Sequence, residues 1–97
     1  MKTVFKTLEQ AIEAGEYHPE VLATFEEWDE LSRIMQFHLI RKALDNRRRD
    51  LVSQYAEVSN VLDFSKKPQL QFVLENIQRS IKELEAERER LYVEYSS

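Results

Sequence analysis

The side chains that could carry acid–base or metal chemistry are few and scattered along this 97-residue chain. His18 and His38 have neither the Glu-x-x-His nor the His-x-x-x-His spacing that places two ligands on one helix face. We expect His38 at a core edge or on the surface, with a role as ligand or base as the alternative. The chain has no Cys and a single Gly, so it lacks thiolate ligands and a phosphate-binding glycine loop. We therefore expect a non-enzymatic protein without metal or cofactor.

Three arginines stand where the apolar pattern would place hydrophobic residues, and they are the first candidates for binding an anion or a partner. They are Arg41, Arg48 and Arg88. One interpretation is that their aliphatic stems cover the apolar rows while their heads reach water or pair with Glu85 or Glu87. They could also fix register and partner choice at some cost in stability. The functional alternative is a site for an anion or an acidic partner.

Charge is unevenly distributed along a chain whose net charge is −4. Residues 1–30 hold two lysines against eight carboxylates, whereas residues 41–50 hold five basic residues against two aspartates. Opposite patches on one small protein favour contact with itself or with a second copy.

The run Arg47-Arg48-Arg49, with Arg41 and Lys42 before it, forms a basic island. Consecutive helical residues point about 100° apart, so the three arginines do not share one face. We interpret the island as a solvated face or as a contact for an acidic partner. The alternative is a nucleic-acid patch, which the overall acidity disfavours.

The high charged fraction, 33%, with one Gly and two Pro, predicts an all-α protein of a single domain. We expect a first helix over about 4–14, N-capped by Thr3 and ended by a left-handed Gly15. A second helix follows over about 24–62, where Thr24 and Glu27 have the spacing of a capping box, after a short turn from Pro19 to Ala23. A start at Pro19 is the alternative. A third helix spans about 68–95 beyond the connection 63–67.

The second and third predicted helices each carry an apolar row with alternating spacings of three and four residues, the heptad rhythm of a coiled coil. One row is Ile34, Phe37, Arg41, Leu44, Arg48, Leu51, Tyr55, Val58 and Leu62, and the other is Leu70, Leu74, Ile77, Ile81, Leu84, Arg88, Leu91 and Tyr95. The connection is short, so the helices must be antiparallel neighbours. Folding there pairs Leu62 with Leu70, Tyr55 with Ile77, Leu51 with Ile81, Arg48 with Leu84, Leu44 with Arg88 and Phe37 with Tyr95.

A second apolar row on the long helix lies opposite the first and predicts cover on both sides. It consists of Phe25, Trp28, Ser32, Met35 and Leu39. Residues 31–40 are then apolar nearly all round, which predicts burial on every side. The first helix, through Phe5, Leu8 and Ile12, would complete a small three-helix core. Phe72 falls on the outer face of the third helix, with Val93 further along that side, which suggests a contact with a partner or another copy.

Beyond residue 43 the predicted hairpin has only two helices, which bury little surface, so we expect a homodimer forming a four-helix arrangement.

No apolar run approaches the roughly 20 residues of a membrane span. Residues 1–10 lack the apolar core of a secretion signal. We therefore expect a cytoplasmic adaptor, assembly factor or regulator. The candidate contacts are Arg41, Arg47, Arg48, Arg49, Arg88 and Phe72. Nucleic-acid binding through residues 41–49 is the alternative, and membrane-surface attachment by the first helix is disfavoured by its three glutamates.

Overall fold

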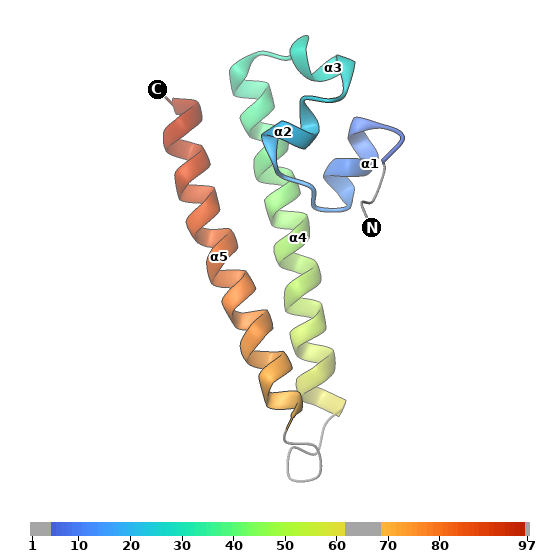
Figure 1. Ribbon diagram of the computed structural model, residues 1–97, viewed down its shortest axis with the longest axis vertical. Coiled ribbons are helices and arrows are strands. Elements are labelled where there is room, and N and C mark those ends of the chain that lie inside the picture. The colour runs from blue at the N-terminus through green and yellow to red at the C-terminus, as the bar shows by residue number, and fades with distance from the viewer. Residues whose placement is uncertain (1–4, 62–68, 97) are drawn as a thin grey trace.

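Two long antiparallel helices form the body of the protein (Figure 1). The computed structural model describes residues 5–61 and 69–96, and within those ranges it holds five helices and no strand. They are α1 (Leu8–Glu13), α2 (Pro19–Leu22), α3 (Glu26–Asp29), α4 (Arg33–Val61) and α5 (Leu70–Ser96). The three short helices lie beside the end of α4 where the chain enters it (Figure 1). The predicted all-α helical hairpin is confirmed.

The first helix is shorter than predicted and is capped at both ends. The Thr7 hydroxyl accepts the backbone N–H of Gln10 at 3.1 Å, so the helix begins at Leu8. Gly15 ends it with φ +85°, as predicted, because its N–H reaches Ile12 O and the next N–H reaches Ala11 O. The predicted cap at Thr3 lies outside the described residues.

The prediction of one helix from Thr24 onward is wrong, because the chain breaks twice before α4 begins at Arg33. The Thr24 hydroxyl donates to Val21 O at 2.7 Å, so it closes α2 instead of capping a new helix. The Ser32 hydroxyl accepts the N–H of Met35 and thereby starts α4. These breaks fold Leu22 and Trp28 back into the core, where both are buried. A straight helix would have carried them away from it.

The hairpin has the register that the two apolar rows predict. The rings of Phe37 and Tyr95 lie 6.0 Å apart, and Gln78 donates to the Tyr55 hydroxyl at 3.2 Å, one residue from the predicted partner Ile77. The predicted row of α5 faces inward through buried Leu74, Ile77, Leu84 and Leu91. The predicted Leu62–Leu70 pair and the start near Pro68 involve residues outside the described ranges.

The expectation that residues 31–40 are buried on every side is wrong. Ile34 is 81% exposed and Met35 46%, whereas Ile40 and Ala43 are fully buried. The reason is that α1 and α5 cover neighbouring sides of α4. These two sides meet at Ile40 and Ala43, and the side of α4 opposite them stays exposed. The core cluster gathers there, and its buried members are Leu8, Ala11, Ile12, Leu22, Trp28, Ile40, Ala43, Leu44, Leu84 and Leu91.

In its half away from the short helices, α4 is less well buried than the facing part of α5, where Leu74 and Ile77 are buried. From position 45 to position 60 of α4 no residue is buried. The radius of gyration is 16.1 Å, against about 13 Å for a compact chain of this length. No helix among the described residues is long and apolar enough to cross a membrane.

Candidate interaction surface

The three arginines of the apolar rows all lie along the contact line between α4 and α5. Arg88 forms an ion pair with Asp45, and Arg48 Nε lies 3.9 Å from Glu85 Oε1. The pairing of Arg48 with Glu85 is one that the sequence predicted, whereas Asp45 was not foreseen as the partner of Arg88. Arg41 is exposed and makes no ion pair with any residue that the structure describes. These polar pairs border the apolar seam without interrupting it.

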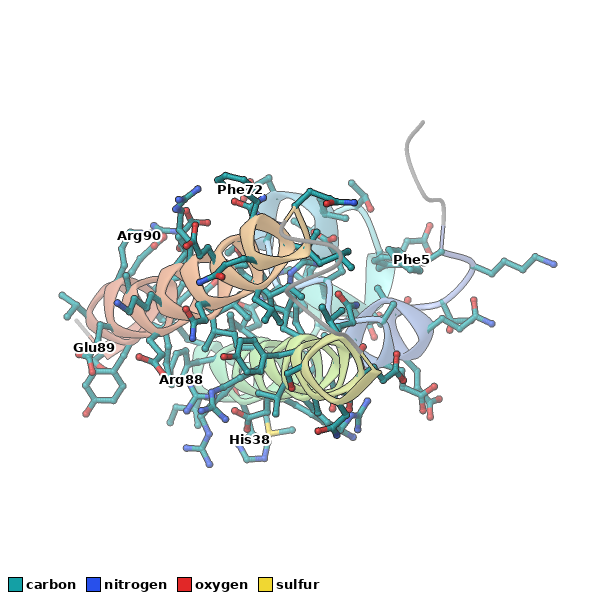
Figure 2. All side chains as sticks on the ribbon, turned by 90° about the horizontal axis from the view of Figure 1, so that it is seen from below. Phe5, His38, Phe72, Arg88, Glu89 and Arg90 are labelled. Atoms are coloured by element: carbon teal, nitrogen blue, oxygen red, sulfur yellow. The ribbon has the colours of Figure 1, made fainter. Side chains whose placement is uncertain are left out.

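Among the residues that the structure describes, one side of the hairpin is lined only by α4 and α5, and we call it the open face. Two shallow depressions, of about 740 and 390 Å³, lie along it. Figure 2 shows Arg88 and Glu89 on this side, with His38 of α4 below them. The open face consists of Phe37, Arg41, Asp45 and Arg48 from α4 and Lys82, Glu85, Arg88, Glu89 and Tyr92 from α5.

The opposite side of the hairpin, which we call the covered face, is occupied by the connection between α1 and α2. Tyr17 lies against Glu83, Ala86, Glu87 and Arg90 of α5. Its ring stacks on His18, 4.3 Å between centroids. Burial raises the pKa of the Tyr17 hydroxyl above its usual value, and the Glu87 carboxylate adds to that shift.

The α1–α2 connection is held against α4 by close backbone contacts. A side chain at Gly15 would meet the Cβ of Arg47 at 2.8 Å. Asn46 Nδ2 donates at 3.0 Å to Ile12 O, the carbonyl at the end of α1 that also accepts the Gly15 N–H. Nothing in the sequence indicated this role of Asn46, because a cap supplied by a distant element leaves no local pattern.

The basic island does not form one surface. Arg47 lies beside Gly15 and Tyr17, Arg48 points to Glu85 on α5, and Arg49 Nε lies 3.6 Å from Asp50. This divergence agrees with the helical geometry used above. Of the island's arginines, Arg41 and Arg48 belong to the open face, and Arg47 belongs to the side covered by the short helices.

An aromatic cluster closes the end of the hairpin where α5 finishes. The Phe37 ring meets Tyr92 edge-on at 5.8 Å and stacks with Tyr95. Arg33 lies over the Tyr95 ring, 4.9 Å from its centroid, and donates to the backbone carbonyl of Glu94 at 2.6 Å. A cation at a helix C-terminus is favourable, so Arg33 caps α5 from across the hairpin. Sequence reasoning missed this role, which requires the tertiary register.

Phe72 points outward, as predicted, and is 68% exposed, with Val93 65% exposed on the same helix. Figure 2 places Phe72 and Arg90 on the side of the hairpin away from Arg88. Phe72 is therefore not part of the open face, and the structure does not bring it together with the candidate arginines.

The histidines show no shared site. His18 Nδ1 lies 2.9 Å from Glu16 Oε1, and His38 is exposed on α4, far along the chain from that pair. Among the residues that the structure describes, no three side chains of the metal-ligating types form a group.

No family model, no curated protein and no solved structure matches this chain.

Proposed function

We propose that this protein is a non-enzymatic protein–protein interaction module, an adaptor, assembly factor or regulator, that associates with itself through its helical hairpin. The observation that carries the proposal is the unburied half of the hairpin. Residues 45–60 of α4 include no buried side chain, and beyond Asn46 and Arg47, which contact Ile12 and Gly15, α5 is the helix that lies beside this half of α4. A two-helix segment of this kind gains little burial alone, whereas a second hairpin beside it would supply the missing core.

Exposed apolar side chains support the same proposal. The large ones include Ile34, Phe72, Tyr92 and Val93, each more than half exposed. Aromatic side chains are enriched at the centres of protein interfaces. We extend the proposal to a cytoplasmic location, which subcellular fractionation of the tagged protein would test.

Light scattering coupled to size exclusion, at two protein concentrations, tests self-association. We expect a mass of twice the 11.6 kDa chain at micromolar concentration. A mass of one chain at both concentrations would contradict the proposal.

Nucleic-acid binding through Arg41–Arg49 is the alternative from another class. The divergence of Arg47, Arg48 and Arg49 argues against a continuous phosphate-binding surface. A gel-shift titration at low salt separates the two proposals: a salt-dependent shift would favour nucleic acid, and no shift ends that alternative.

A further inference from the structure

The open face carries opposite charges along its two edges. The α4 edge presents Arg41 and Arg48, and the α5 edge presents Glu85 and Glu89. The central pair, Asp45 and Arg88, is neutralised within the chain, and Lys82 lies at the end of the acidic edge nearest the hairpin turn. The face is therefore basic on one helix and acidic on the other.

Among the residues that the structure describes, part of this charge is unpaired or only weakly paired. Arg48 lies at 3.9 Å from Glu85, the longer of the two ion pairs that join different helices, and both side chains are more than half exposed. Arg41 and Glu89 line the same depression, yet neither makes an ion pair within the described ranges. An exposed pair at such a distance contributes little to folding, so these four charges are available to a partner.

The register of the hairpin places these charges at matching positions along its long axis, which we call heights. The Phe37–Tyr95 contact places Arg48 level with Leu84 and Arg41 level with Leu91. Glu85 and Glu89 are one and two residues from those levels, which is a displacement of about 1.5 to 3 Å along the helix. Each arginine of one edge thus has a glutamate of the other edge at its own height.

Two copies can stack their open faces about a two-fold axis in two ways. If the axis crosses the hairpin, α4 lies on α4 and α5 on α5, which sets arginine against arginine and glutamate against glutamate. If the axis runs along the hairpin, α4 of each copy lies on α5 of the other at the same height, and every contact joins opposite charges. Like-charge juxtaposition disfavours the first arrangement.

We propose that the open face is the surface on which a second copy of this chain docks, with the two-fold axis along the hairpin. Arg41 pairs with Glu89 of the partner subunit and Arg48 with Glu85 of the partner subunit, each contact occurring twice. Exposed Tyr92, beside Phe37, supplies apolar area at one end of the interface. This inference rests on the self-association proposed above and adds its face, its symmetry and its contacts. With the axis along the hairpin, the unburied half of α4, residues 45–60, also lies on α5 of the partner subunit.

Charge reversal tests the arrangement. One variant carries Arg41→Glu with Arg48→Glu, and a second carries Glu85→Arg with Glu89→Arg. Each variant alone should dimerise at least roughly 100-fold more weakly than the parent, because every pair across the interface becomes like-charged. An equimolar mixture of the two variants should form a heterodimer, since every pair of these side chains across its interface again joins opposite charges. The variant with all four changes should dimerise by itself.

A matched control carries Arg79→Glu with Arg90→Glu, which changes the net charge as much as the first variant but alters α5 away from the open face. It should dimerise like the parent, and circular dichroism should show all variants helical. If the parent is a dimer and the two charge-reversed variants dimerise equally well, or their mixture fails to associate, the open face is not the interface although self-association stands. If the parent is a monomer, self-association itself is wrong.

Discussion

At the scale of single residues, Gly15 is the position where the backbone leaves least freedom. Its φ of +85° is unfavourable for any residue with a Cβ, and a Cβ there would meet Arg47 Cβ at 2.8 Å. We expect Gly15→Ala to lower the free energy of unfolding by about 2 to 4 kcal/mol, from backbone strain and overpacking together. Urea denaturation measures the change.

The neighbouring residue provides the control for this prediction. Ala14 has an ordinary φ of −77° and is exposed, so Ala14→Gly should cost no more than about 1 kcal/mol. Equal stability of Gly15→Ala and the parent would contradict the tight contact between α1 and α4.

The raised pKa values of two tyrosines predict how the free energy of unfolding depends on pH. Burial raises the pKa of Tyr17, with a contribution from Glu87, and burial also raises the pKa of Tyr95, with a contribution from Glu94. The folded protein therefore holds these phenolic protons more tightly than the unfolded chain does. The resulting stability is complete below the unfolded value of about pH 10 and is lost as pH rises through the folded pKa values.

We expect the melting temperature of the parent protein to fall as pH rises above about 10. The melting temperature of the double variant, Tyr17→Phe with Tyr95→Phe, should fall less steeply over the same range. The substitutions keep both rings and remove only the titrating hydroxyls. Thermal melts over an alkaline pH series measure the two slopes. Identical slopes in the parent and the double variant would show that these hydroxyls are not the cause.

At the scale of the helices, α4 has one buried side and one open side, and a matched pair of substitutions distinguishes them. Ile40 is fully buried and Ile34 is 81% exposed. Ile40→Ala should cost about 2 to 5 kcal/mol or abolish the helical circular dichroism, whereas Ile34→Ala should stay within about 0.5 kcal/mol. Similar losses at both positions would contradict the arrangement of α1 and α5 around α4.

The sequence predicted the hairpin because the information for it is local. Heptad spacing on both helices and a short connection sufficed to pair Phe37 with Tyr95 and to place Arg48 near Glu85. The breaks around α2 and α3 were missed because side-chain bonds to the backbone compete there with a continuous helix. Gln36 Nε2, for example, donates to Trp28 O at 2.8 Å across the turn. A capping pattern such as Thr24 with Glu27 carries no information about such a competing hydrogen bond.

Like the fold, the candidate site could be predicted from the sequence only in part. The apolar rows identified Arg41, Arg48 and Arg88 as lying at the contact line, and helical geometry identified Phe72 as outward. The open face itself was not predicted, because its definition requires knowing which side of the hairpin the α1–α2 connection covers. The position of Tyr17 against α5 settles that, and it follows from packing over long sequence distances.

At the scale of the whole molecule, the protein is an elongated body of 53 × 29 × 19 Å with its short helices at one end. A two-fold axis along this length keeps each residue at its own height in both copies. Ion pairs across such an interface are partly exposed, so the dimer should weaken as salt is raised.

The distance between two copies of one label tests self-association and its symmetry together. Glu57 is exposed on the half of α4 away from the short helices, and the chain has no native cysteine, so Glu57→Cys accepts a single spin label. With the axis along the hairpin, the two labels lie at the same height, separated only by the helix spacings of about 10 Å and the label arms. We predict a short, well-defined distance by double electron–electron resonance. A separation of about 40 Å, which an axis crossing the hairpin near residue 43 would give because the two labels then lie about 14 residues on either side of it, would contradict the account. So would the absence of a dipolar signal at concentrations where dimer is expected.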